Sequence, residues 1–298
     1  MPAKILVSGS SGLVGTALLP ALQASGYEVT RLVRGTVPGN QQIGWDPARS
    51  LAPESVSGFD TVIHLAGESI VGRWTEAKKG RILESRVQGT RNLVKALVEA
   101  SQRPRVLISG SASGYYGDRG DEILRENSPS GQAFTSELCR QWEAATEAAA
   151  NAGIRTVQIR LGVVLSATGG ALQKMLPPFR MGVGGNMGNG RQWLSWIDLQ
   201  DVIGAIQYIL KTEALQGPVN LASPNPVTNA EFTKTLASVL SRPAVFPMPA
   251  FAARLVFGQM ADELLLASQR LEPAKLLASG YVFQKPDLRR TLSAILEK

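Results

Sequence analysis

The chain has 298 residues, of which 44% are hydrophobic and 18% charged, as in ordinary folded globular proteins. This length is enough for one large hydrophobic core or two smaller ones. The single cysteine, Cys139, excludes an internal disulfide framework and suits a reducing compartment. No apolar run reaches the ~18 residues of a membrane span, and the N-terminus lacks the pattern of a signal peptide. We therefore expect a cytoplasmic protein without a membrane partner.

The formal net charge is +7, and much of it lies within residues 73–105. That stretch contains nine lysines and arginines against Glu76, Glu84 and Glu99. Such a run is typical of the solvated face of a long helix. It could also provide a positive field that attracts phosphate-bearing ligands. We do not expect a nucleic-acid partner, because the stretch has one aromatic residue, Trp74, and so lacks platforms for base stacking.

Short β-rich runs alternate with helical patterns over the first 160 residues. Helices are predicted at 13–25, 75–101 and 134–152. Near-continuous apolar strands are typical of parallel sheets covered on both faces, and strand–helix alternation implies right-handed crossovers. The pattern predicts a Rossmann-type, doubly wound α/β domain. The five predicted strands are Lys4–Ser8, Glu28–Val33, Thr61–Leu65, Arg105–Ser109 and Thr156–Ile159.

The second half has a different pattern, rich in glycine and proline over 162–190. Residues 181–190 include five glycines, which predicts a mobile loop. Helices are expected from Asp198, an N-cap candidate, and from Thr228, which forms a capping-box pattern with Glu231. Short helices are expected over 250–297. We therefore predict a Rossmann domain over 1–165, with 198–221 packing back on it, and a smaller, mostly helical substrate lobe over 166–298.

A glycine-rich segment follows the first predicted strand and begins the first predicted helix. Gly9 allows a tight turn, Gly12 lets the main chain approach a pyrophosphate, and Gly15 lets helix and strand pack closely. The free amides at the helix start would then face the phosphates. The spacing predicts a dinucleotide site. Its expected ligand-binding residues are Gly9, Ser11, Gly12, Leu13, Val14 and Gly15.

The end of the second predicted strand discriminates between the two nicotinamide cofactors. Sites that prefer NAD place Asp or Glu there, about 20 residues beyond the glycines, to bind the ribose hydroxyls. Here the segment reads Thr30-Arg-Leu-Val-Arg34, without an acid. Arg31 and Arg34 can instead pair with a 2′-phosphate through charge-assisted hydrogen bonds. We therefore predict NADP(H) as the cofactor.

Several motifs together resemble the extended short-chain dehydrogenase/reductase family, which includes the NAD-dependent epimerases and dehydratases. The resemblance runs over nearly the whole chain and favours an epimerase-like subgroup with a C-terminal helical extension. It implies further cofactor-binding residues, namely His64, Leu65, Ala66, Gly67, Glu68, Arg86, Ser109 and Arg160. The motifs that carry the resemblance are Gly9–Gly15, Gly44–Pro47, His64–Gly67, Ser111–Gly117, Cys139–Glu143, Trp193–Asp201 and the tail from Phe246 to Leu288.

The resemblance also implies a catalytic set that this sequence lacks. Family enzymes use a tyrosine as general acid/base, a lysine four residues later that lowers its pKa, a serine and an asparagine. The tyrosine and lysine would lie early in the helix that starts near Phe134, yet 134–139 contains neither. The asparagine position falls near Ser85-Arg86. Only the serine remains, as Ser111, with Ser113 next in line.

Three interpretations follow from this departure. Tyr115 or Tyr116 could replace the missing tyrosine, with Arg86 or Arg160 lowering its pKa. A different acid, or water, could supply the proton. The chain could also bind NADP(H) without turnover, as a regulatory or redox-sensing protein. Alternatively, the two tyrosines are simply one buried ring and one surface ring.

The remaining candidate residues have structural alternatives. His64, the only histidine, suits a core or cofactor-wall position better than a catalytic base, and Cys139 suits an inert buried thiol. No cluster has metal-ligand spacing, so no metal is expected. Trp193, Trp196 and the 181–190 loop could form a wall and a lid of the substrate cleft, or pack ordinarily.

The sequence therefore predicts an NADP(H)-dependent oxidoreductase or epimerase-like enzyme. By analogy with the family, the substrate is small and polar, and resembles a sugar. A homodimer through the helices near 75–101 and 134–152 is a further expectation from the resemblance. The alternative function is the non-catalytic NADP(H)-binding protein described above.

Overall fold

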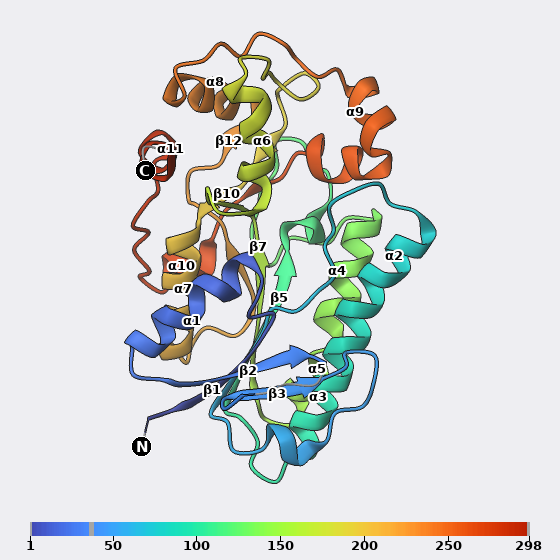
Figure 1. The fold of residues 1–298 in the computed structure, drawn as a ribbon, viewed down its shortest axis with the longest axis vertical. Coiled ribbons are helices and arrows are strands. Elements are labelled where there is room, and N and C mark those ends of the chain that lie inside the picture. Colours follow the sequence, from blue (N-terminus) through green and yellow to red (C-terminus); the bar gives the residue numbers. More distant parts are fainter. Residues whose placement is uncertain (1, 36–38, 297–298) are drawn as a thin grey trace.

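The computed structural model describes residues 2–35 and 39–296. Its centre is a seven-stranded sheet in the order β11-β7-β5-β4-β1-β2-β3, in which every neighbouring pair is parallel (Figure 1). The predicted doubly wound parallel α/β sheet is thus confirmed. The strands are β1 (Lys4–Ser8), β2 (Glu28–Arg34), β3 (Gln42–Trp45), β4 (Thr61–His64), β5 (Val106–Ala112), β7 (Arg155–Leu161) and β11 (Gly217–Leu221).

All five predicted strands are present, and the two edge strands β3 and β11 were not predicted. Each edge strand contains a glycine, and β11 begins Gly-Pro, which is a turn signal rather than a strand signal. Two predicted helices are each divided. The segment 75–101 forms α2 (Glu76–Leu83), one turn of π-helix (Glu84–Gln88) and α3 (Gly89–Glu99), whereas 134–152 forms α4 (Phe134–Ala144) and α5 (Glu147–Asn151).

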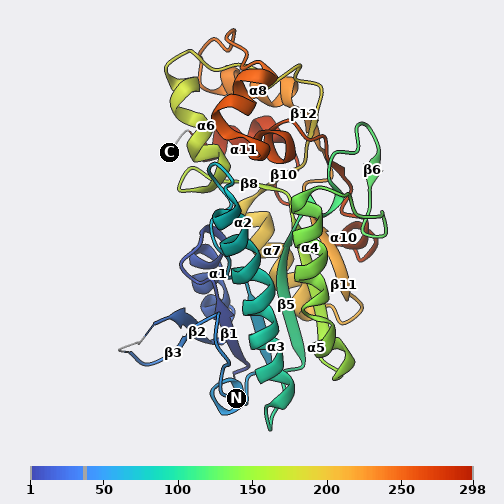
Figure 2. The same ribbon diagram turned by 90° about the vertical axis from the view of Figure 1, so that its right-hand side faces the viewer.

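Helices cover both faces of the sheet. On one face, α1 (Leu13–Ala24) and α7 (Leu199–Lys211) pack over a core that includes Leu18, Ile63 and Ile206. On the other face, α3 and α5 pack over a core that includes Leu6, Leu93 and Leu107 (Figure 2). Because the strands are buried on both sides, they read as nearly continuous apolar runs.

Much of the rest of the chain forms a second, mostly helical lobe above the carboxyl ends of the strands (Figure 1). Its core joins residues of α6, α8 and α11, including Leu176, Phe232 and Leu292. The predicted capping box is present, since Thr228 and Glu231 each accept the other's main-chain N–H. The lobe's helices are α6 (Gly170–Arg180), α8 (Asn229–Val239), α9 (Ala250–Phe257), a π-helical turn (Ala261–Leu265) and α11 (Leu288–Leu296). Helix α10 (Ala274–Ala278) instead packs against β11, and its Leu276 belongs to the core under α7.

Short strands and polar contacts join the two lobes. The strands form three pairs, namely β6 (Ile123–Leu124) with β13 (Arg270–Leu271), β8 (Val163–Leu165) with β10 (Trp196–Asp198), and β9 (Trp193–Leu194) with β12 (Val227–Thr228).

The Glu263 carboxylate accepts the Thr135 N–H at 2.8 Å and the Thr135 hydroxyl at 2.9 Å, and so caps α4 from 128 residues downstream. Asp201 similarly accepts the main-chain N–H groups of Gln284 and Lys285. The C-terminal segment is therefore tied to helices on both faces of the sheet. No helix among the described residues is both long and apolar enough to span a membrane.

Candidate functional site

The glycine-rich segment forms a tight turn between β1 and α1. Gly9 has φ +70°, and a Cβ there would lie 2.5 Å from the Leu65 carbonyl carbon. A Cβ at Gly15 would lie 2.3 Å from the Gly9 carbonyl oxygen. No side chain caps the start of α1 at Gly12, so amides of the first turn remain available to a ligand. This cradle fits a pyrophosphate.

The other predicted residues of this turn lie where a dinucleotide would pass. Ser11 is exposed, whereas Leu13 and Val14 begin α1 and are half-buried. The Leu13 side chain lies close to Gly169 and Gly170, where added Cβ atoms would lie 3.2 and 3.0 Å from it. The start of α1 therefore meets the segment that leads into the second lobe.

Arg31 lies beside the glycine turn. Its Nε donates to the hydroxyl of the buried Ser10 at 3.1 Å, which holds the half-buried guanidinium against the turn. Arg34 is the last residue of β2 and is exposed. Neither position is an acid, so the local structure provides cations where an NAD site would provide a carboxylate.

His64 is fully buried under the segment that follows β4. The Ser8 hydroxyl lies 2.6 Å from His64 Nδ1, and the Thr90 hydroxyl lies 3.0 Å from Nε2. Burial lowers the pKa of His64 to about 4, so the ring is neutral near pH 7. Trp142 Nε1 also donates to the Thr90 hydroxyl at 3.1 Å. The hydrogen bonds of His64 thus fix the end of β4, directly before the predicted cofactor-lining residues Leu65, Ala66 and Gly67.

The Arg86 side chain contacts this same segment. Its Nη1 donates to the Glu68 carbonyl at 2.8 Å, and its guanidinium lies 5.1 Å from the centre of the Trp142 ring. A Cβ at Gly67 would lie 2.9 Å from Arg86 Cζ, so this glycine leaves room for the guanidinium. Burial lowers the pKa of Arg86 from its ordinary value. The structure therefore places a largely buried cation against the segment that follows β4.

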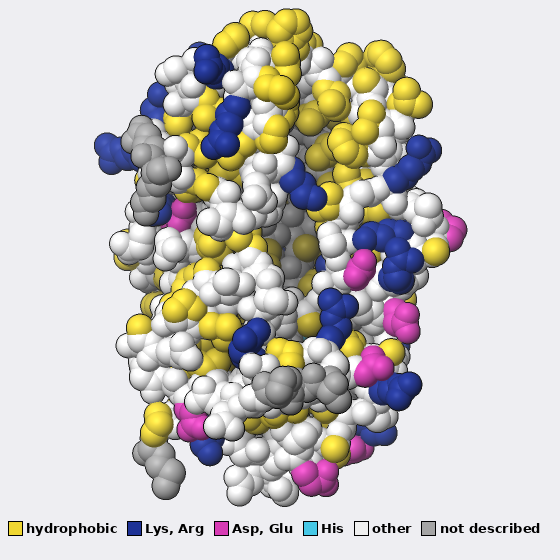
Figure 3. Space-filling model, in the orientation of Figure 1, with side chains coloured by type: hydrophobic (Ala, Val, Ile, Leu, Met, Phe, Trp, Pro, Cys, Tyr) yellow, Lys and Arg dark blue, Asp and Glu magenta, His cyan; other side chains and the backbone are white. Residues whose placement is uncertain are grey.

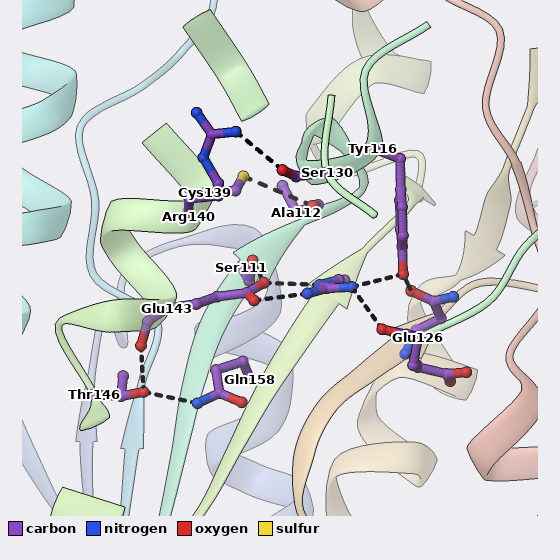
Figure 4. Close-up of polar contacts among 12 residues, drawn as sticks. Ser111, Ala112, Tyr116, Glu126, Ser130, Cys139, Arg140, Glu143, Thr146 and Gln158 are labelled. Atoms are coloured by element: carbon purple, nitrogen blue, oxygen red, sulfur yellow. Dashed lines mark hydrogen bonds and ion pairs between the residues drawn. The ribbon is translucent and has the colours of Figure 1, made fainter. Parts of the chain in front are cut away.

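A buried polar network lies at the end of β5 (Figure 4). The Ser111 hydroxyl donates to Glu143 Oε1 at 2.6 Å. Arg160, on β7, donates to both oxygens of Glu143 at 2.8 Å, and its side chain is only 3% exposed. Burial opposes the charge on Arg160, but Glu143 raises the pKa of Arg160 above its ordinary value. This ion pair connects β5, β7 and α4 beneath the predicted catalytic serine. Ser109, two residues earlier, is also buried.

Tyr116 belongs to this network. Its hydroxyl donates to Asn220 Oδ1 at 2.7 Å and accepts from Arg160 Nη1 at 2.9 Å. Burial raises the pKa of Tyr116 to about 12, although Arg160 partly opposes this effect. The direction is opposite to the lowered pKa that a tyrosine acid/base needs.

Tyr115 differs from its neighbour. Its half-buried ring lies over the Arg160 guanidinium, with 3.4 Å from Cζ to the ring centre. Within the described residues, its hydroxyl makes no hydrogen bond.

The first turn of α4 contains no group that resembles a tyrosine–lysine pair. Thr135 packs against Gly114, and its hydroxyl donates to Glu263. Four residues later, Cys139 is buried beside the Ala112 carbonyl, and burial raises the pKa of its thiol to about 12. The thiol is therefore protonated and unreactive, as expected for a structural cysteine. Within residues 2–35 and 39–296, no three His, Cys, Asp or Glu side chains cluster as a metal site requires.

The two tryptophans of the second lobe have different positions. Trp196 is fully buried and its Nε1 donates to the Asn225 carbonyl at 2.9 Å, so it belongs to the core. Trp193 is half-buried, donates to Asp121 at 2.8 Å and lies under the Arg270 guanidinium. Of the pair, Trp193 is the one that can contribute to a cleft wall.

A hollow lies near the centre of the face shown in Figure 3, with lysine and arginine side chains beside it.

A cavity of about 330 Å³ lies between the turn after β5 and α9, where Gly117, Thr135 and Glu263 contribute to its lining. A cavity of about 930 Å³ lies at the amino ends of the strands, beside Asp60, Arg105 and Arg155. This larger cavity is at the opposite end of the sheet from the glycine turn, so we do not assign the chemistry to it.

The sequence analysis did not identify the residues that hydrogen-bond or pack against the predicted site residues. Glu143 and Trp142 lie within the motif Cys139–Glu143, so their pattern was visible although their role was not. Glu263 and Asn220 gave no local signal, because their partners lie about 100 or more residues away.

Comparisons with known families identify the family of this chain. A sequence model of the NAD dependent epimerase/dehydratase family matches residues 5–222, and a domain of unknown function, DUF1731, matches residues 248–295. The chain belongs to the NAD-dependent epimerase/dehydratase family. The resemblance inferred from the motifs is thus confirmed.

Relatives match over nearly their whole length. Human epimerase family protein SDR39U1 is 38% identical over 98% of this chain and 99% of its own. Epimerase family protein MT2273 of Mycobacterium tuberculosis is 41% identical over 94% of this chain and 93% of its own.

Solved structures show the same fold. The crystal structure of human SDR39U1 (isoform 2) with NADPH has a TM-score of 0.91, at 36% identity and 99% coverage of both chains. A nucleoside-diphosphate sugar epimerase from Corynebacterium glutamicum has a TM-score of 0.82 at 38% identity, covering 99% of this chain and 58% of that one. MoeE5 with UDP-glucuronic acid and NAD, at 19% identity and a TM-score of 0.79, is similar in fold.

Proposed function

We propose that this protein is an NADP(H)-dependent oxidoreductase or epimerase-like enzyme that acts on a small polar substrate. The single observation that carries the proposal is Arg31 of β2, which Ser10 holds against the glycine turn, on a strand that ends in Arg34 and not in a carboxylate. A guanidinium there favours a cofactor with an extra phosphate. The presence of NADPH in the human relative supports this choice.

Each part of the cofactor would contact a different part of the chain. Amides of the first turn of α1 would bind the pyrophosphate, and Arg31 with Arg34 would pair with the 2′-phosphate. The Leu65–Glu68 segment and Arg86 would line the ribose and nicotinamide. When bound, NADPH supplies a hydride. The carboxyl ends of the strands are the usual place for such a ligand in this fold.

Tyr115 is the phenol we propose as proton donor. Tyr116 is less suitable, because both partners of its hydroxyl are protein groups and its pKa is raised to about 12. The Ser111 hydroxyl has one proton and donates it to Glu143, so toward a substrate it can only accept. Ser113, half-buried in the turn after β5, would then be the hydroxyl that donates to a substrate oxygen.

A second candidate function is NADP(H) binding without turnover. Two observations favour it: Thr135 is bonded to Glu263 at the start of α4, and Cys139 has a strongly raised pKa four residues later. Neither can act as the family's tyrosine–lysine pair. A protein of this kind would not transform a substrate. Its conformation, or the partner it binds, would instead depend on whether NADP(H) is bound and on its oxidation state.

An NADPH titration followed by an oxidation assay separates the two functions. The assay would measure NADPH consumption against a panel of carbonyl compounds and nucleotide sugars. We expect Tyr115→Phe to lower turnover by about 100-fold or more with NADPH affinity unchanged, because proton transfer typically contributes that much.

Tyr116→Phe is the matched control, since the same hydroxyl is removed one residue away. It should reduce stability and leave the pH profile of turnover unchanged. If NADPH binds in the micromolar range and no compound on the panel is turned over, the enzyme proposal fails and the binding protein is the better account.

A further inference from the structure

The second lobe carries a concentrated group of exposed hydrophobic side chains. Among the described residues, eleven large hydrophobic side chains are exposed, and seven of them belong to this lobe's outer loop and α9. Most are 56–76% exposed, whereas a folded protein usually scatters such residues singly. We call these seven the apolar patch: Met181, Val183, Val245, Phe246, Phe251, Leu255 and Val256.

The segments that carry the apolar patch are in direct contact. The Phe246 N–H donates to the Gly184 carbonyl at 3.1 Å, and the Gly188 N–H donates to the Met248 carbonyl at 2.9 Å. A Cβ at Gly182 would lie 3.4 Å from Pro243. The loop after α6 therefore runs along the segment that leads into α9, so the residues of the apolar patch belong to adjoining segments.

Helix α9 has the reverse of the usual surface pattern. It reads AFAARLVF, and Phe251 and Leu255, four residues apart on one face, are 72% and 76% exposed. Its Ala253 is fully buried. A short surface helix normally turns polar residues to water, so this one presents an unpartnered apolar face. Figure 3 shows hydrophobic side chains gathered over this upper part of the molecule.

Basic residues outnumber acidic ones around the apolar patch. The segments 170–191 and 232–260 contain no Asp or Glu. Arg180 directly precedes Met181, and Arg242 directly precedes Pro243, which lies against the loop. Arg254 is paired with Asp262 at 2.8 Å. The six basic residues of these segments are Lys174, Arg180, Arg191, Lys234, Arg242 and Arg254.

We propose that the apolar patch docks on an anionic lipid surface, with Phe251 and Leu255 entering the interfacial region and the neighbouring arginines contacting lipid headgroups. Exposed aromatic and aliphatic side chains beside basic ones are the signature of a protein that lies on a membrane without crossing it. A second copy of the chain fits less well, because a two-fold contact through this patch would bring like charges together.

This proposal revises the expectation that the chain has no membrane partner. That expectation rested on the absence of a spanning segment, which says nothing about attachment to a lipid surface. The signal was hard to see in the sequence, because it depends on which side chains of α9 face outward.

Vesicle co-sedimentation of the full chain tests the proposal. Vesicles would contain phosphatidylcholine alone or phosphatidylcholine mixed with phosphatidylglycerol. We expect binding to the anionic vesicles to be at least about tenfold tighter and to weaken with added salt, because headgroup attraction is screened. Phe251→Ser combined with Leu255→Ser should abolish it. Arg180→Gln and Arg242→Gln should each weaken it about fivefold.

Val282→Ser is the matched control. Val282 is 71% exposed but lies outside the apolar patch, so its replacement should leave vesicle binding unchanged. Unaltered NADPH affinity of every variant verifies that it is folded. Equal binding to both vesicle types, or none, overturns the proposal. A dimer in light scattering that the Phe251→Ser/Leu255→Ser variant converts to a monomer also overturns it, because the patch is then a contact between copies.

Discussion

The glycine turn after β1 and the network at the end of β5 lie at the same edge of one sheet, yet they are built differently. The turn depends on main-chain atoms, since Cβ atoms at Gly9 or Gly15 would overlap backbone. The network depends on side chains from β5, β7 and α4, chiefly Arg160 and Glu143. A site made of main-chain atoms depends little on the identity of neighbouring side chains. A site made of side chains can change whenever one of its residues is substituted. In this chain the glycine turn is present, whereas residues 134–139 contain neither tyrosine nor lysine.

The largest effect should come from breaking the buried ion pair. Arg160→Met would leave Glu143 buried without its partner, and we expect a loss of about 4 kcal/mol in the free energy of unfolding. Urea denaturation measures it. The double variant Arg160→Met/Glu143→Met should be markedly more stable than the single one, because no charge is then stranded. If Arg160→Met lowers the free energy of unfolding by less than about 1 kcal/mol, the ion pair does not contribute to stability as proposed.

The next effect concerns the backbone-built site. Gly15→Ala should cost about 3 kcal/mol of stability and weaken NADPH binding, because its Cβ would overlap the Gly9 carbonyl. Thermal unfolding and fluorescence titration measure the two changes. Gly80→Ala is the matched control. Gly80 is also a glycine within a helix, but a Cβ at this position would meet no atom within 4 Å. Equal effects of both substitutions would contradict the close contact.

A smaller effect on stability should come from His64, which lies between the glycine turn and α3. Its pKa is about 4 in the folded protein against an ordinary 6.5, so the unfolded chain binds more protons between these values. Stability should therefore fall as pH drops, by about 2 kcal/mol from about pH 7 to about pH 5. Urea titrations of the wild type and of His64→Gln at both pH values measure it. If the variant keeps the same pH dependence, other groups are responsible.

Most of the sheet and of its helices could be predicted because their signals are local. Apolar strands, the Gly9–Gly15 spacing and the Thr228–Glu231 capping box each involve residues near one another in the chain, and each forms as expected. The edge strands β3 and β11 were missed because both are short and contain glycine, and β11 begins with the turn signal Gly-Pro.

The candidate site was less predictable because its contacts are not local. Tyr116 was a candidate acid by its motif, but its environment comes from Arg160 and Asn220, 44 and 104 residues away. The effect of burial on its pKa depends on packing that no spacing reveals. Likewise, the cap that Glu263 gives α4 joins segments that belong to separate family motifs.

The choice of cofactor by Arg31 is the central claim, and paired titrations test it most directly. Wild-type protein would be titrated with NADPH and with NADH, and the titrations repeated with Arg31→Gln. The account predicts tighter binding of NADPH, and a loss of at least about tenfold for NADPH alone in the variant, because one phosphate contact is removed. Tighter binding of NADH by the wild type would contradict the choice of cofactor. Failure of both nucleotides to bind would contradict the whole account of the site.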